Sequence, residues 1–152
     1  MMRRTIETCA VAAFALGLAA PLAAEPAARD IAARTELHTI HTLTLSDKQF
    51  LNGDAEAKAT DVSGQLRLPA AAGRLPVVVL MHGSGGMGPN IEMWAREFNA
   101  IGVGSFAIDG FTGLTQTSTN QALLGRLNFI LDIYRGLDVL AKHPASIRSA
   151  SF

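Results

Sequence analysis

Apolar and polar positions divide this chain into two alternating stretches followed by two mainly apolar runs. Residues 36–45 and 62–68 alternate, as half-buried strands do, and could pair as a hairpin. Residues 76–81 form a continuous apolar run rich in valine, which is typical of a strand buried on both faces of a parallel sheet. Residues 103–108 predict a second buried strand, ending at Asp109. In the first strand we expect one side to be buried, formed by Leu37, Thr39, His41, Leu43 and Leu45.

A helix is predicted after each of the two apolar runs. The first can be capped by Asn90 and carries a core stripe of Ile91, Trp94, Ala95, Phe98 and Ile101. The second follows a capping box at Ser118 and Gln121, and its stripe is Leu123, Leu127, Ile130, Tyr134, Leu137 and Ala141. His143 and Pro144 end it. Buried strands that alternate with helices predict an α/β fold with a mostly parallel sheet.

The first 24 residues have the pattern of a secretory signal. Arg3 and Arg4 precede an apolar stretch at 10–20, and small residues lead to a polar Glu25. The apolar stretch is shorter than the roughly 20 residues needed to span a bilayer, so we expect cleavage after Ala24 and no stable membrane insertion afterwards. The exported product would be periplasmic or secreted. Residues 25–35 then form a flexible leader, and 36–152 form the domain.

Composition removes several classes of function. Cys9 is the only cysteine and would leave with the signal, which excludes disulfides and cysteine-ligated metal from the mature chain. The 13 basic and 13 acidic residues balance and no basic patch is present, so nucleic-acid binding is not expected. His38 and His41 lie three apart on a predicted strand and therefore point to opposite faces. We predict no metal site and no cofactor.

The turn after the 76–81 strand is the most informative motif. It contains His82, Gly83, Ser84, Gly85 and Gly86, at the strand end where open α/β sheets place their ligand sites. Glycines allow a sharp turn whose amide N–H groups can stabilise a developing oxyanion. This turn, the Trp94-Ala95 pair in the next helix, the segment Phe106 to Phe111 and the helix from Leu124 together resemble the dienelactone hydrolase family of α/β-hydrolases, over residues 60–144.

The resemblance implies the first part of a three-layer sandwich and a cofactor-free hydrolase of a small ester or lactone. It assigns the backbone N–H of Ser84 to the oxyanion hole and places Asp109 as a candidate lining the cleft. His82 is expected to shape the loop rather than act as a base. No serine of the chain lies in G-x-S-x-G, so the nucleophile, acid and base are not encoded and no catalytic residue is assigned. We expect a fragment or a shifted reading frame, truncated before the nucleophile strand and inactive as it stands.

Two alternatives remain open from the sequence. One is a non-catalytic exported α/β protein that keeps the loop as scaffold. The other is a dinucleotide-binding domain, because Gly83, Gly85 and Gly88 fit G-x-G-x-x-G and Asp109 follows about 20 residues later. Pro89 weighs against this second alternative, because it would fall inside the helix of such a site.

Overall fold

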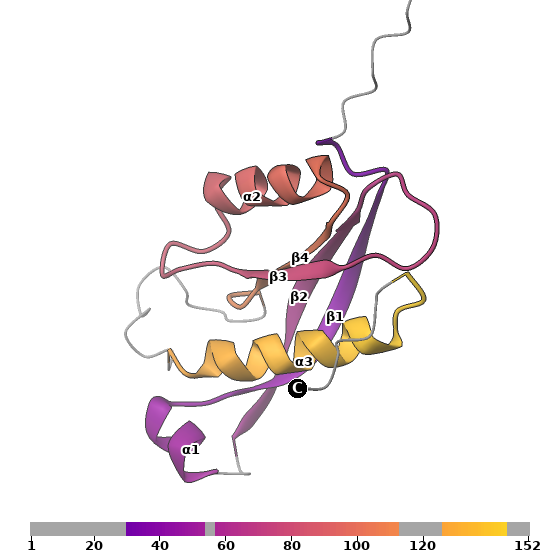
Figure 1. Ribbon diagram of the computed structural model, residues 1–152. Coiled ribbons are helices and arrows are strands. Elements are labelled where there is room, and N and C mark those ends of the chain that lie inside the picture. Colours follow the sequence, from indigo (N-terminus) through magenta and orange to yellow (C-terminus); the bar gives the residue numbers. More distant parts are fainter. Residues whose placement is uncertain (1–29, 54–56, 113–125, 146–152) are drawn as a thin grey trace, which may run out of the picture.

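The computed structural model describes residues 30–53, 57–112 and 126–145. The predicted signal (1–24), residues 25–29 of the leader, and the capping box at 118–121 with Leu123 lie outside these residues. Figure 1 shows the elements, which are β1 (Arg34–Thr44), α1 (Asp47–Asn52), β2 (Lys58–Leu68), β3 (Val77–Met81), α2 (Pro89–Ala100), β4 (Gly104–Asp109) and α3 (Asn128–Lys142). β1 thus begins inside the segment predicted as leader. None of the helices in the described ranges is long and apolar enough to cross a membrane.

The four strands form one sheet in the order β1-β2-β4-β3. β1 and β2 pair antiparallel, which confirms the predicted hairpin, with Ile40 opposite Val62. β2 is also antiparallel to β4, and only β3 and β4 are parallel. The expected mostly parallel sheet is therefore wrong for the described residues. The reason is that β2 reverses direction against both of its neighbours, whereas the α2 crossover makes a single parallel pair.

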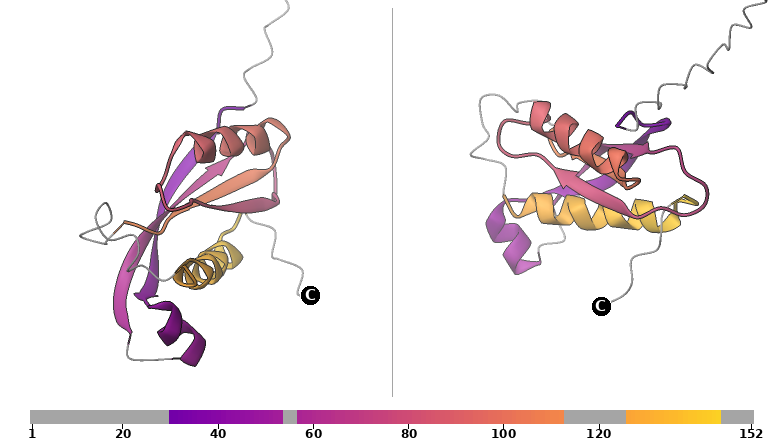
Figure 2. Two further views of the ribbon diagram at one scale, coloured as in Figure 1. Left: turned by 90° about the vertical axis from the view of Figure 1, so that its left-hand side faces the viewer. Right: turned by 45° about the horizontal axis from the view of Figure 1, so that its top comes forward.

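Helices cover both faces of the sheet. α2 packs on one face and α3 on the other, as Figures 1 and 2 show. The apolar core lies on the α3 face and includes Ile40, Val62, Leu66, Leu68, Phe106, Ile108 and Leu140. Two glycines allow this close packing. A Cβ on Gly64 would lie 2.2 Å from Phe106 Cζ, and one on Gly136 would lie 2.6 Å from Ile108 Cδ1. Because both atoms are already in the core, neither site has room for a side chain.

β1 buries the opposite side from the one predicted. Ile40 and Thr42 are buried, whereas Leu37 is 78% exposed. Leu37 and its i+2 neighbours stand on the α2 face, and α2 lies mainly over β4, β3 and β2 rather than over β1. β3 also departs from expectation, since all five of its residues are only half-buried. It occupies the edge of the described sheet, next to β4 alone.

The helices differ from the predicted ones in their ends and in their buried faces. α2 begins with Pro89 at its first turn and Gly88 as N-cap, so Asn90 is not the cap. Trp94, expected in the core, is 50% exposed. α3 buries Asn128, Asp132, Gly136 and Leu140, and leaves much of the predicted stripe exposed, with Tyr134 at 65%.

The short helix α1 was not predicted. Ser46 and Gln49 form a capping box at its start, and Gly53 ends it in the left-handed region with a φ of 64°. Only six residues separate these signals, so an apolar stripe could not reveal the helix. In the sequence, Asn52 and Gly53 indicate only a turn at this point.

Candidate functional site

The glycine-rich turn lies at the carboxyl end of β3, beside the end of β4. Met81 pairs with Ile108, so His82, which follows β3, and Asp109, the last residue of β4, are neighbours. The structure therefore brings the predicted loop and the predicted cleft residue together. The Asp109 side chain is 34% exposed.

His82 joins the two strand ends through both of its ring nitrogens. Its Nδ1 lies 2.7 Å from the carbonyl oxygen of Gly83, and the N–H of Gly110 donates to Nε2 at 3.1 Å. Because Nε2 accepts a hydrogen bond from the Gly110 N–H, Nδ1 is the protonated nitrogen and donates to the Gly83 carbonyl oxygen. The His82 side chain is fully buried. The lone pair on Nε2 already accepts a hydrogen bond, which favours a structural role for the ring.

Aromatic rings enclose this histidine. The Phe111 and Phe129 ring centroids lie 4.5 Å and 5.2 Å from that of His82. Gly110 is required at the contact, since an added Cβ would lie 2.7 Å from Phe129 Cε1. Asp109 is held as well, because its Oδ1 accepts the N–H of Phe111 at 3.1 Å. The sequence analysis gave neither phenylalanine a place in the site, and Phe129 reaches His82 only because α3 starts beside β4.

The turn itself is closed by a hydrogen bond from the Gly86 N–H to the Gly83 carbonyl at 3.1 Å. Gly86 has a φ of 79°, a left-handed conformation that favours glycine. Ser84 and Gly85 form the exposed middle of the turn. Within the described ranges, their N–H groups have no hydrogen-bond acceptor. Two exposed backbone donors are therefore free to bind a ligand oxygen.

A buried carboxyl group lies behind the site. Asp132 is fully buried on α3, where Thr42 Oγ1 donates to its Oδ1 at 2.6 Å and Asn128 Nδ2 donates to its Oδ2 at 3.3 Å. Asn128 Oδ1 in turn accepts the backbone N–H of Leu45 at 2.8 Å. Burial raises the pKa of Asp132, and the hydrogen bonds from Thr42 and Asn128 offset part of that rise. No sequence signal indicated this network, since the two polar residues lay outside the apolar stripe.

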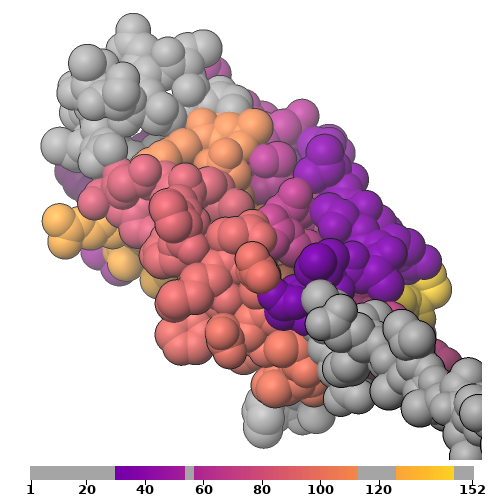
Figure 3. Space-filling view, turned by 90° about the horizontal axis from the view of Figure 1, so that it is seen from above, coloured from indigo at the N-terminus to yellow at the C-terminus, as the bar shows by residue number. Residues whose placement is uncertain are grey.

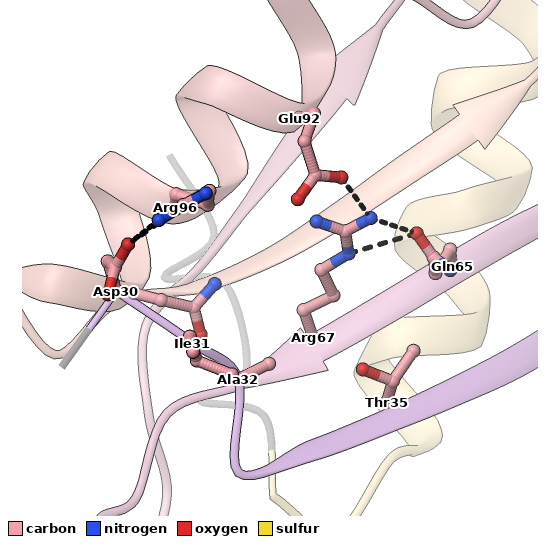
Figure 4. Close-up of a pocket in the computed structure, with 9 residues that line it drawn as sticks. Asp30, Ile31, Ala32, Thr35, Gln65, Arg67, Glu92 and Arg96 are labelled. Carbon is pink, nitrogen blue, oxygen red and sulfur yellow. Dashed lines mark hydrogen bonds and ion pairs between the residues drawn. The ribbon is translucent and has the colours of Figure 1, made fainter. Parts of the chain in front are cut away.

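A separate polar cavity of about 210 Å³ lies on the α2 face, as Figure 4 shows. Arg67 bonds Gln65 at 2.7 Å and Glu92 at 2.6 Å, and Arg96 pairs with Asp30. The hydrogen bond from Arg67 lowers the pKa of Glu92. Figure 3 views the molecule from this side, with α2 next to the indigo residues that precede β1. Both arginines already have acid partners, so the lining presents little net charge to a ligand.

The comparisons with known proteins give similarity to solved structures but none to families or curated proteins. No protein-family model matches the chain, and no curated protein matches it. A solved structure of a dienelactone hydrolase-like promiscuous phosphotriesterase from metagenomic libraries is similar, with a TM-score of 0.49 and 20% identity. The similarity covers 76% of this chain and 46% of that protein, so this chain spans less than half of that protein's length.

Proposed function

We propose that this chain carries the oxyanion-binding loop of an exported hydrolase that acts on a small ester or lactone. The observation that supports it best is the pair of exposed, free N–H groups at Ser84 and Gly85, in a turn fixed at the carboxyl end of β3. That end of the sheet is where α/β proteins bind their ligands. The chain contains no G-x-S-x-G, so it alone does not supply the nucleophile.

Each residue has a defined part in the proposed mechanism. The Ser84 N–H donates to the carbonyl oxygen of the substrate as negative charge develops on it, and the Ser84 hydroxyl takes no part. His82 holds the glycine-rich turn against the end of β4, so that the Ser84 N–H is in place before the reaction. Removing one such donor from an oxyanion hole costs roughly 100- to 1,000-fold in kcat. A second donor would come from the residue after the nucleophile.

The test compares two substitutions of Ser84. Ser84 follows Gly83 in the turn and has a negative φ, a position that proline accepts. Ser84→Pro therefore removes the N–H, whereas Ser84→Ala keeps it as the matched control. The probe is 4-nitrophenyl methylphosphonate, an anion that mimics the tetrahedral intermediate. Its binding is followed by the amide NMR shifts of residues 82–88.

We expect the probe to shift the Ser84 and Gly85 amides in the parent chain and in Ser84→Ala, and to bind more weakly to Ser84→Pro. Hydrolysis of 4-nitrophenyl acetate should stay at the background rate. Unmoved amides would contradict the proposal. Hydrolysis that Ser84→Ala abolishes would make the hydroxyl a nucleophile and overturn the assigned role.

Dinucleotide binding is the second candidate, favoured by the parallel β3–α2–β4 unit with Asp109 at its end. Pro89 occupies the first turn of α2, where proline is tolerated; it would clash only if the helix began before Gly88, as the fingerprint requires. The loop length still weighs against the site, because Gly83, Gly85 and Gly88 all precede the helix. Asp109 also uses Oδ1 to bind the Phe111 N–H. Unchanged amide spectra at millimolar NADH would remove this candidate.

Export is part of the same proposal and has a direct test. The chain expressed in a Gram-negative host should be recovered from the periplasm with an N-terminus at Glu25, measured by intact mass. Recovery only in the cytoplasm, with Arg3 and Arg4 retained, would contradict it. A processed chain that fails the phosphonate titration would instead match the non-catalytic exported protein.

A further inference from the structure

Two histidines and a glutamate meet at the far end of α3 from His82. Glu36 and His38 lie two apart on β1 and face the same side of the sheet, and His143 follows the last turn of α3. Glu36 Oε2 lies 3.2 Å from His38 Nε2 and 3.0 Å from His143 Nε2. The three ligand atoms all lie within 4.8 Å of one another. The fold thus gathers them from segments 105 or more residues apart.

From this arrangement we propose a binding site for a divalent transition-metal ion, with Zn²⁺ as the best match. Zinc sites use His nitrogen and carboxylate oxygen at about 2.0–2.2 Å, and two imidazoles with one glutamate form a known three-ligand set with an open fourth position. Bonds of that length in a tetrahedron place neighbouring ligand atoms roughly 3.3 Å apart. The two Glu36–histidine distances, 3.0 and 3.2 Å, are close to that spacing.

The surroundings of the cluster favour ligation by a single carboxylate oxygen. Arg34 Nε binds Glu36 Oε1 at 2.6 Å, which leaves Oε2 for the two histidines. Hydrogen bonds of this kind hold ligating carboxylates in orientation. Oε2 is therefore the carboxylate oxygen placed to bind a metal ion together with the two histidines.

One contact has to change when the metal binds. The N–H of Ala145 donates to His143 Nδ1 at 3.2 Å, which makes Nε2 the protonated nitrogen. Metal at Nε2 requires the proton to move to Nδ1, so this hydrogen bond is lost. This exchange lowers the affinity of the site for the metal ion. It also makes the Ala145 amide a local reporter of ligation.

The experiment is a titration of the full chain with ZnCl₂ by calorimetry, in a Cys9→Ser background that removes the thiol. His41 is the matched control, because it is on the same strand but exposed on the other face, paired with Asp61 at 2.6 Å. We expect one site that is weakened at least about tenfold by His38→Ala and by His143→Ala and is unchanged by His41→Ala. Glu36→Gln, which keeps the side-chain shape, should also weaken it.

Two further readouts keep the result decisive if a histidine variant folds poorly. CoCl₂ should give the intense visible absorption of a tetrahedral site, and Zn²⁺ should shift the Ala145 amide in NMR spectra of the Cys9→Ser chain. Absence of saturable zinc binding would overturn the proposal. So would zinc binding that survives both Glu36→Gln and His38→Ala.

Discussion

Replacing Gly136 by alanine is expected to destabilise the chain, although alanine is the better helix former. Gly136 lies within α3, where glycine costs about 0.5–1 kcal/mol relative to alanine. The added Cβ would lie 2.6 Å from Ile108 Cδ1 and 3.2 Å from Phe106 Cε1. Ile108 and Phe106 are fully buried, so neither can move into solvent. Overpacking of this kind costs about 1–3 kcal/mol, which exceeds the gain in helix propensity.

The prediction is sharpest as a double-mutant cycle with Ile108→Val. That substitution removes the Cδ1 atom that the new Cβ would meet, and alone it should cost about 0.5–1.5 kcal/mol. In the double variant the strain is relieved, so the free energy of unfolding should exceed the additive value by about 1 kcal/mol or more. Urea unfolding followed by far-ultraviolet circular dichroism measures all four chains.

Two outcomes would refute this reasoning about α3. One is a Gly136→Ala chain that is more stable than the parent by the full helix-propensity term. The other is additivity of the two changes within about 0.5 kcal/mol, the value expected of independent sites. Either outcome would mean that α3 does not lie against Ile108 as closely as described.

Three further predictions concern single positions. Because the pKa of Asp132 is raised in the folded chain, its stabilising contribution is present below the unfolded pKa and is lost as pH rises through the folded pKa. The parent chain should therefore lose thermal stability from pH 3 upward in a way that Asp132→Asn does not. The same pH profile in both chains would contradict the buried carboxyl group. Gly102→Ala should cost about 1–2 kcal/mol in urea unfolding, because Gly102 has a φ of 83° and nothing within 4 Å of an added Cβ, so a neutral result would exclude backbone strain there. Ser46→Ala removes the hydroxyl that accepts the Gln49 N–H at 3.3 Å. Amide hydrogen exchange should accelerate in α1 while the rest of the chain keeps its protection. Loss of protection throughout the chain would show instead that α1 supports the sheet.

The sequence was sufficient for the order of the larger elements because their patterns are long. The apolar run at 77–81, the alternation at 62–68 and the helix ending at Lys142 were each found within a few residues of their observed ends. The β1–β2 hairpin also followed, since two alternating stretches close in sequence tend to pair. Strand direction did not follow, because β2 lies between β1 and β4 and no local pattern encodes that position.

Buried faces were harder to predict than element positions. On β1 the buried side carries a single apolar residue, Ile40, whereas the opposite side carries Leu37 and Leu43, so the apolar pattern indicates the wrong side. The observed side is buried because Ile40 meets Val62 and Phe106 in the core. On α3 the buried side includes Asn128 and Asp132, whose polar groups are satisfied by Thr42 and the Leu45 N–H. A hydrophobic stripe cannot indicate a face that is buried through hydrogen bonds.

The residues of the candidate site also differ in how well the sequence indicates them. The loop residues 82–86 could be recognised because they are contiguous. Gly110, Phe111 and Phe129 could not, since they join His82 only through the fold. The Glu36–His38–His143 cluster was not predicted, because His38 was compared with His41 on the same strand and not with His143, which follows α3.

The two hydrogen bonds of His82 also bear on how this chain can diverge. The ring donates to Gly83 and accepts from Gly110, so it links the glycine-rich turn to a residue 28 positions away. A side chain that replaces histidine must offer a donor and an acceptor at the same separation, and any residue larger than glycine at 110 would displace Phe129. Homologous chains should therefore change at positions 82, 110 and 129 together or not at all. Such correlated substitution would identify the loop in homologous sequences whose overall similarity is no longer detectable.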